Sequence, residues 1–264
     1  MTTNKKYSLS GDALNKIKNS VIAKRLCFFE SVTSTFDVLS EISDNEGTLV
    51  VAAHQTNGRG RLGRSWDSDK GGIYFSFSLP PNDSQSPAFV TLVCALAVQK
   101  ALSKYLKCHI KWPNDIVSDG KKLCGILTKS TFSEDKIKNI FVGIGINANN
   151  CLFPKELVNA TSLKLLTGKD VDENLLLIEV IKELDLYCFN KNHDDVLKEY
   201  KNNCVNIGQS VTIHYTDGRG DIKGKCTDVL TDGTMNVILD DGKLINVSSG
   251  EVSVKGIYES ERTM

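Results

Sequence analysis

The pattern of apolar residues changes near Gly208, and this change constrains the fold more than any other feature of the chain. Beyond it, short β-type runs alternate with the turn pairs Asp217-Gly218, Asp232-Gly233 and Asp241-Gly242. Short strands separated by such turns are typical of a small all-β barrel. Before it, strand-like and helix-like runs alternate. The sequence therefore predicts two domains, residues 1–205 and residues 206–264.

In the first domain, apolar runs bounded by turn residues predict strands over residues 26–29, 49–53, 71–79, 109–112, 122–129 and 140–146. Helical patterns cover residues 36–42, 87–106, 173–189 and 194–202. Asp119-Gly120 suits a hairpin turn between the strands at 109–112 and 122–129. In the second domain, β-type runs cover residues 211–215, 235–239 and 244–247.

Charge and hydropathy exclude several classes of function. Lys+Arg and Asp+Glu balance at 32 each, so no overall field attracts nucleic acid or an anionic membrane. No apolar stretch approaches the ~20 residues that span a bilayer, and the first seven residues lack the apolar core of a signal peptide. We expect a cytoplasmic protein that binds neither DNA nor a membrane.

The cysteines and histidines give no sign of a metal site. The eight cysteines include no Cys-x-x-Cys pair, and several lie within apolar runs, which indicates buried, reduced thiols. The four histidines are scattered without metal-binding spacing. We therefore predict no transition metal held by the protein.

The segment GRGRLGRSW, residues 58–66, alternates glycines with arginines and ends on one of the two tryptophans. Arginine is always charged and carries five donors, whereas glycine leaves the backbone free to bend. Many basic loops are simply solvated. This one has the composition to wrap an anion and become ordered around it.

Three further segments carry candidate chemistry. Lys111 to Asp115 (KWPND) places a cation, an aromatic ring and a carboxylate within five positions, beside a proline that stops regular strand pairing. Lys122 opens an apolar strand. Residues 143–147 (GIGIN) lack the third glycine and the helix of a dinucleotide fingerprint, so we expect these glycines to admit a close backbone or a flat ring.

Together, in this order and spacing, these segments resemble the catalytic domain of biotin protein ligases (biotin–[acetyl-CoA-carboxylase] ligases). The resemblance runs from about Ser31 to the C-terminus and includes residues 160–163 (ATSL). It implies an α+β fold with a mixed central β-sheet and flanking helices, followed by a small SH3-like β-barrel. The family contains both monomers and homodimers.

The resemblance also implies the reaction. Biotin and ATP, with Mg²⁺, form biotinyl-5′-AMP, which a lysine of a biotin carboxyl carrier protein or another biotin-acceptor domain then attacks. The resemblance assigns catalytic roles to Lys122, which would bridge the biotin carboxylate and the phosphate, and to Lys111, Arg61 and Asp115. The residues that it implies for biotin binding are Ser34, Thr35, Phe36, Gln55, Arg59, Gly60, Arg61, Lys122 and Gly125. Those that it implies for nucleotide binding are Arg59, Arg61, Arg64, Trp66, Lys111, Asn114 and Asn147.

Two positions depart from the family pattern. Phe36 stands where the family has the asparagine of Ser-Thr-Asn, so one polar contact is expected to be absent or supplied elsewhere. Leu62 replaces the second arginine of an Arg-Arg pair, so no phosphate contact is expected there.

The sequence leaves two alternative functions to consider. A lipoate–protein ligase shares the fold and the adenylation chemistry, but the loop at 58–66 together with KWPND argues against it. A biotin-sensing repressor would need a winged helix-turn-helix, and only 33 residues precede Ser34. We expect a ligase without a DNA-binding domain.

Overall fold

The computed structural model describes residues 15–80, 86–134, 136–215, 220–248, 251–254 and 257. The first group of strands is β1 (Arg25–Phe29), β2 (Thr48–Ala52), β3 (Gly72–Leu79), β4 (His109–Lys111), β5 (Asp115–Ser118), β6 (Lys121–Ser133) and β7 (Lys136–Asn147). The second group is β8 (Ser210–His214), β9 (Asp221–Val229), β10 (Met235–Leu239), β11 (Leu244–Val247) and β12 (Glu251–Val254). The helices are α2 (Thr35–Glu41), α3 (Pro87–Leu102), α4 (Leu163–Thr167), α5 (Glu173–Asp185) and α6 (His193–Asn203), with short helical turns η2 (Arg61–Gly63) and η3 (Leu186–Asn190).

The first group of strands forms one sheet in the order β1-β2-β3-β7-β6-β5-β4. Only the pair β1–β2 is parallel, and the other neighbouring strands run antiparallel. The predicted α+β fold with a mixed central sheet is therefore confirmed. Among the described residues, no helix is long and apolar enough to cross a membrane.

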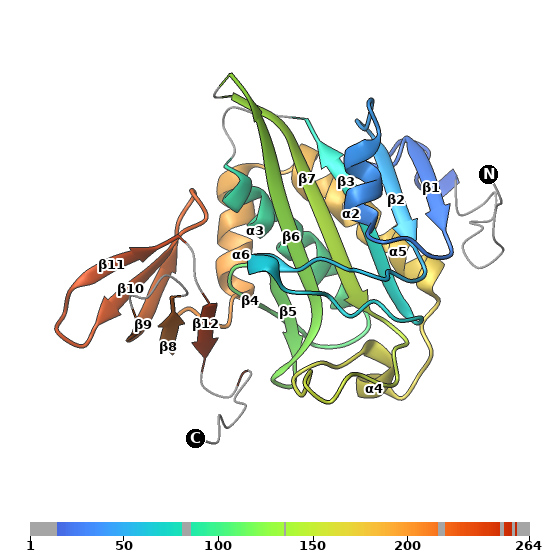
Figure 1. The fold of residues 1–264 in the computed structure, drawn as a ribbon. Helices are drawn as coiled ribbons and strands as arrows, with labels where there is room; N and C mark the ends of the chain where they lie inside the picture. The colour runs from blue at the N-terminus through green and yellow to red at the C-terminus, as the bar shows by residue number, and fades with distance from the viewer. Residues whose placement is uncertain are drawn as a thin grey trace.

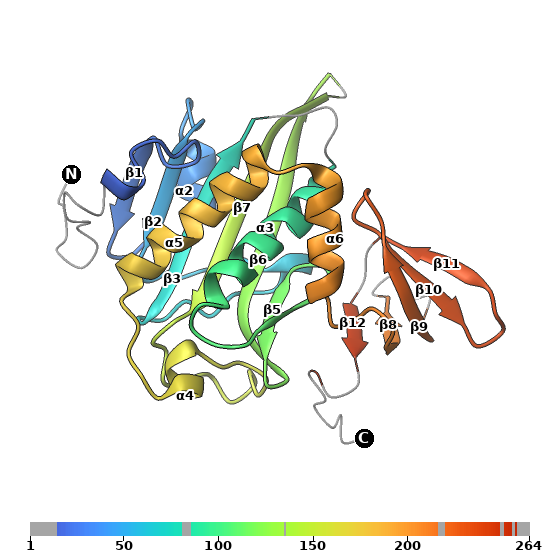
Figure 2. The ribbon, with the colours of Figure 1, turned by 180° about the vertical axis from the view of Figure 1, so that it is seen from behind.

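The two faces of this sheet are covered differently. Helices α3, α5 and α6 pack on one face, as Figure 2 shows. The other face carries α2 and the segment between β2 and β3, which crosses in front of β6 and β7 in Figure 1. Because both faces are covered there, every residue of β3 is buried, which explains why its sequence holds only apolar and small residues, Ser76 and Ser78 among them.

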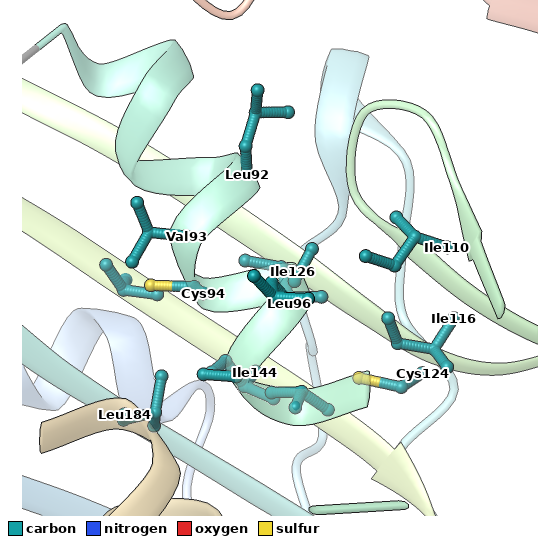
Figure 3. Packing of buried hydrophobic residues seen from close by; sticks show 14 of the residues in the cluster. Leu92, Val93, Cys94, Leu96, Ile110, Ile116, Cys124, Ile126, Ile144 and Leu184 are labelled. Atoms are coloured by element: carbon teal, nitrogen blue, oxygen red, sulfur yellow. The ribbon is translucent and has the colours of Figure 1, made fainter. Parts of the chain in front are cut away.

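Helix α3 forms the centre of the core. Ser86 caps its start by accepting a hydrogen bond from Phe89 N, and Pro87 occupies the first turn. Its side chains are mostly apolar on all sides because it lies between the sheet and the outer helices; Figure 3 shows Leu96 of this helix close to Ile126 of β6. The helix ends at Leu102 rather than near residue 106, because the next residues tighten into turns.

The predicted hairpin at Asp119-Gly120 was misplaced. Strand β5 lies between the two strands that the turn was expected to join, and it pairs with both β4 and β6. Asp119-Gly120 therefore connects β5 to β6, with positive φ at both residues as a tight hairpin turn requires. Strand β5 was missed because it is short and directly follows Pro113 and Asn114.

The second group of strands forms an antiparallel sheet in the order β11-β10-β9-β8-β12. It lies beside α6 and β4, at the opposite end of the molecule from β1 (Figures 1 and 2). Turns at Asp232-Gly233 and Asp241-Gly242 join its strands as predicted, whereas Asp217-Gly218 lies outside the described residues. Strands β9 and β12 were not predicted, and the closed SH3-like barrel stays a prediction.

Candidate active site

A cavity of about 1140 Å³ lies between the α2 face of the first sheet and strands β8, β9 and β12. Every residue predicted from the sequence to belong to the site lines it: Ser34, Thr35, Phe36, Gln55, Arg59, Gly60, Arg61, Arg64, Trp66, Lys111, Asn114, Asp115, Lys122, Gly125 and Asn147. These residues come from segments that lie far apart in the sequence. The fold therefore brings all of the singled-out segments to one place.

A buried polar cluster forms one end of the cavity. Ser34 caps α2, which fixes the backbone so that Thr35 faces inward. Thr35 N and Oγ1 both donate to Gln55 Oε1, at 2.8 and 3.1 Å, and Thr35 Oγ1 lies 2.8 Å from Ser76 Oγ. Gln55 Nε2 in turn donates to Ser68 Oγ at 2.8 Å. This end can both donate hydrogen bonds to a ligand and accept them from it.

Lys122 and Asp115 form a close ion pair near the middle of the cavity. Lys122 Nζ lies 2.6 Å from Asp115 Oδ1, and both side chains are mostly buried. The pairing of β5 with β6 creates this contact. Lys122 Nζ also lies 5.2 Å from the centre of the Trp66 ring, which favours the cation.

Trp66 lies flat over the glycines of β6 and β7. A Cβ atom at Gly145 would stand 2.3 Å from Trp66 Nε1, and one at Gly125 would stand 2.8 Å from its Cζ3. Only glycine fits beneath the ring at these two positions. The prediction that the GIGIN glycines admit a close backbone or a flat ring is confirmed for Gly145, whereas a Cβ atom at Gly143 would make only ordinary contacts with Phe36 and Ser76.

The Arg/Gly loop (residues 58–66) is anchored at two points. Arg59 Nη2 lies 2.8 and 2.9 Å from the two carboxylate oxygens of Asp37 on α2. Arg61 Nη1 donates to Asn114 Oδ1 at 2.9 Å. Leu62, directly after the second anchor, has a φ of 55°, is exposed, and supplies an apolar side chain at the edge of the cavity.

Lys111 and Asn147 lie at buried strand ends beside the cavity. Lys111 is only 7% exposed. Asn147 Nδ2 donates to Thr161 O at 2.9 Å, which ties the end of β7 to the ATSL segment. The same segment pairs with Lys122, whose N donates to Asn159 O and whose O accepts from Thr161 N.

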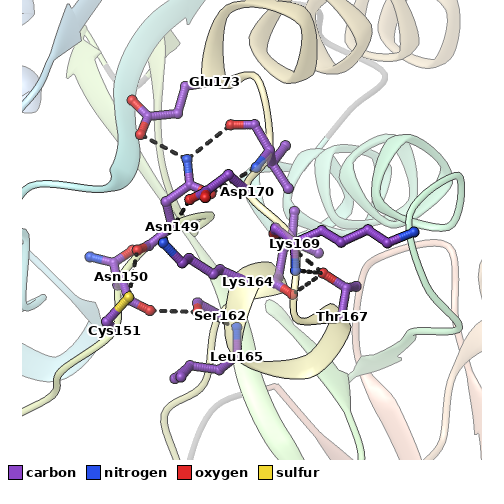
Figure 4. Close-up of polar contacts among 12 residues, drawn as sticks. Asn149, Asn150, Cys151, Ser162, Lys164, Leu165, Thr167, Lys169, Asp170 and Glu173 are labelled. Atoms are coloured by element: carbon purple, nitrogen blue, oxygen red, sulfur yellow. Dashed lines mark hydrogen bonds and ion pairs between the residues drawn. The ribbon is translucent and has the colours of Figure 1, made fainter.

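Polar contacts hold the chain between β7 and α5 (Figure 4). Asn149 Nδ2 donates to Val171 O and Glu173 Oε1, at 2.9 and 3.1 Å. Ser162 Oγ donates to Asn150 O. These contacts fix the segment that contains the cavity residues 156–160.

Phe36 takes part in an aromatic wall rather than in polar contacts. Its ring lies 5.8 Å from that of Phe141, edge to face, and Lys129 Nζ lies 5.5 Å from its centre. The Thr35, Gln55 and Ser76 cluster supplies polar atoms next to this ring.

Sequence reasoning missed several cavity residues. Ser76 was detectable as a buried polar residue between Phe75 and Phe77, but the cavity residues from β8, β9 and β12 had no local signal. Asp67 also lines the cavity; burial raises the pKa of its carboxyl, Asp69 and Glu156 raise it further, and His54 opposes them.

Comparison with known proteins shows which family this chain resembles. The biotin/lipoate A/B protein ligase family model matches residues 28–147. The chain is 38% identical over 191 residues to the bifunctional ligase/repressor BirA of Bacillus subtilis, a stretch that covers 69% of this chain and 57% of that protein. It is 28% identical over 221 residues to the biotin–[acetyl-CoA-carboxylase] ligase of Mycobacterium tuberculosis, covering 80% of each.

Among solved structures, the biotin protein ligase of Aquifex aeolicus in complex with biotin and ATP is 35% identical with a TM-score of 0.76, over 88% of this chain and 99% of that one. The chain therefore belongs to the biotin protein ligase family. The chain spans 57% of the length of the BirA proteins of Bacillus subtilis and Bacillus spizizenii that it matches.

Proposed function

We propose that this protein is a biotin protein ligase that condenses biotin with ATP to biotinyl-5′-AMP and pyrophosphate, then transfers biotin to an acceptor lysine. The observation that carries the proposal is the cavity that all of the predicted site residues line. The complex of the Aquifex aeolicus relative with biotin and ATP supports the choice of substrates.

The charges around the cavity suit the first step. A biotin carboxylate and the α-phosphate of ATP are both anionic, so their approach needs cations and directed donors. Lys122, Lys111 and Arg61 would provide them, with Arg64 at the nucleotide side and Asn147 near the adenine. The Thr35–Gln55 cluster would bind the ureido ring of biotin, beside the wall that Phe36 forms.

The second step needs an uncharged lysine amine as nucleophile. Asp115 would orient or deprotonate that amine, because it already accepts an ammonium group, that of Lys122, at 2.6 Å. The amine would then attack the carbonyl carbon of the mixed anhydride, and AMP would leave.

Mg²⁺ would enter with ATP as part of the substrate. The described residues contain no group of three or more His, Cys, Asp or Glu side chains placed to hold a metal ion. This fits a metal carried mainly by phosphate oxygens and water.

We also propose a domain boundary at residues 205/206, an acceptor domain of a carboxylase as the partner, and a cytoplasmic location. All eight cysteines are free thiols, as a reducing compartment favours. A single-function ligase without DNA binding, as monomer or homodimer, stays a prediction.

The test is ATP–pyrophosphate exchange with the purified protein. Exchange should depend on biotin. Lipoate in place of biotin should not support exchange, and an equal concentration of lipoate added to biotin should not inhibit it. Exchange that responds to lipoate instead would contradict the proposal in favour of the lipoate–protein ligase.

A further inference from the structure

The Arg59–Asp37 anchor is one of the contacts that join the Arg/Gly loop to other parts of the fold; others are the Arg61–Asn114 hydrogen bond and the packing of Trp66 against Gly125 and Gly145. Gly60 N donates to Arg64 O at 2.7 Å and Trp66 N donates to Gly58 O at 2.8 Å, so these bonds fold the loop onto itself. The Arg59–Asp37 pair instead joins the loop to a separate element, α2. Together with the Arg61–Asn114 hydrogen bond, it ties the folded loop to the elements around the cavity.

The Arg59–Asp37 pair has closer geometry than an ordinary surface ion pair. One nitrogen of Arg59 lies within 2.9 Å of both oxygens of Asp37, whose side chain is 25% exposed. Asp37 is in the first turn of α2, where a negative charge is favoured. It directly follows Thr35 and Phe36, so the pair ties the loop to the element that lines the polar end of the cavity.

We propose that Asp37 is a positioning residue that, through Arg59, holds the Arg/Gly loop across the cavity and so retains the acyl-adenylate until the acceptor arrives. The inference rests on the proposed function. Asp37 is absent from the cavity lining and acts through Arg59, which lines it. Lys122 and Lys111, two of the cations assigned to adenylate formation, line the cavity from strands β6 and β4 rather than from the loop, so that step depends on Asp37 less than retention does.

The alternative is that this is one more solvated ion pair, which typically contributes little. The chain offers a matched control in the pair of Arg25 and Asp44. The side-chain ion pair there is longer, at 3.9 Å, and the Asp44 side chain is 85% exposed. Asp44→Asn removes the same charge from the same domain, away from the cavity.

The experiment compares Asp37→Asn, Asp37→Glu and Asp44→Asn with the unsubstituted protein. We measure release of biotinyl-AMP by rapid filtration, ATP–pyrophosphate exchange, and trypsin cleavage after the arginines of the loop without substrates. In Asp37→Asn, release and loop cleavage should both be roughly two- to fivefold faster, as expected for losing one partly exposed pair. The kcat of exchange should stay within about twofold.

Two further results are expected. Asp37→Glu keeps the charge and should bring release and cleavage back toward the unsubstituted values, while Asp44→Asn should change neither. Raising salt to about 1 M should narrow the difference between Asp37→Asn and the unsubstituted protein, because ions screen the pair.

Equal release and equal loop cleavage in Asp37→Asn and the unsubstituted protein would overturn the inference, as would an Asp37→Glu variant that behaves like Asp37→Asn. Cleavage at arginines outside the loop reports whether a variant is folded. The cleavage measurement needs no substrate, so it tests the role of Asp37 in holding the loop independently of the reaction. Pyrophosphate exchange that did not depend on biotin would contradict the proposed function and leave the cleavage result valid.

Discussion

Lys122 is the residue for which the structure supports the largest effect. Its ammonium group lies 2.6 Å from Asp115 and faces the Trp66 ring within the cavity. Lys122→Ala removes a cation from the place where the carboxylate and the phosphate would meet. We expect ATP–pyrophosphate exchange to fall by about 10²- to 10³-fold in a protein that still folds, with a lower thermal unfolding midpoint because Asp115 loses the partner of a mostly buried ion pair.

Lys121→Ala is the matched control, because Lys121 is the exposed neighbour on the same strand. It should exchange pyrophosphate like the unsubstituted protein. If Lys122→Ala retained nearly full exchange, Lys122 would have no part in the reaction.

Arg61 anchors the far side of the Arg/Gly loop through Asn114. Arg61→Gly removes this contact and gives the backbone more freedom, and both changes favour an open loop. We expect weaker biotin binding, faster release of biotinyl-AMP, and biotinylation of lysines on a bystander protein. Rapid filtration and a blot of the bystander measure these effects.

Lys70→Gly serves as the control, since Lys70 follows the loop but does not line the cavity. Unchanged retention and selectivity in Arg61→Gly would mean that Arg61 is only a solvated loop residue.

At the level of elements, Glu199 of α6 joins three parts of the helical layer. Lys100 of α3 approaches its carboxylate at 2.9 Å, Tyr187 of η3 donates to it at 2.8 Å, and Lys191 lies 3.4 Å away. The hydrogen bond from Lys100 is the main cause that lowers the pKa of Glu199 to about 2, although burial opposes it.

A carboxyl whose pKa is lower in the folded protein than in the unfolded chain stabilises the fold above the unfolded pKa. Its contribution is lost as the pH falls from about 4.5 to about 2. We expect Glu199→Gln to lower the thermal midpoint by roughly 2–4 °C at pH 7 and the difference to shrink below pH 4.5. Calorimetry across this pH range measures it, with the exposed Glu41→Gln as control; a difference independent of pH would contradict the assignment.

At the level of the whole molecule, the C-terminal sheet is docked through Trp112 and the β9–β10 turn. Trp112 N donates to Asn206 Oδ1 at 2.7 Å, and Trp112 Nε1 donates to Gly233 O at 3.1 Å. A Cβ atom at Gly233 would lie 2.6 Å from Ala88 Cβ at the start of α3. The turn therefore packs directly on the start of α3.

Gly233→Ala should loosen this docking. Gly242 is the matched control, because it follows an aspartate in the neighbouring turn with a similar positive φ (83° against 87°), but a Cβ atom there would meet none of the described residues within 4 Å. We expect Gly233→Ala to cost about 1–3 kcal/mol more than Gly242→Ala in urea unfolding. Equal losses would show that only the backbone conformation matters at these turns.

Local patterns predicted most of the fold. Strand β3 and helix α3 were recognisable because their burial imposes a regular apolar spacing over many residues. Strands β5 and β9 were missed for the opposite reason: β5 has only four residues, and β9 alternates exposed charges with small buried residues such as Gly224 and Cys226. Such strands are defined by their partners rather than by their own composition.

For the candidate site, the sequence by itself indicated the GRGRLGRSW and KWPND segments, because these motifs carry their chemistry in adjacent positions, but it missed the cavity residues of β8, β9 and β12. Only the tertiary structure decided how the segments meet: that Arg59 pairs with Asp37, that Trp66 fills the space above Gly125 and Gly145, and that Trp112 turns toward the C-terminal sheet. Each of these contacts joins residues that lie far apart in the chain. Their formation depends on strand pairing and packing across the whole molecule, which no local pattern encodes.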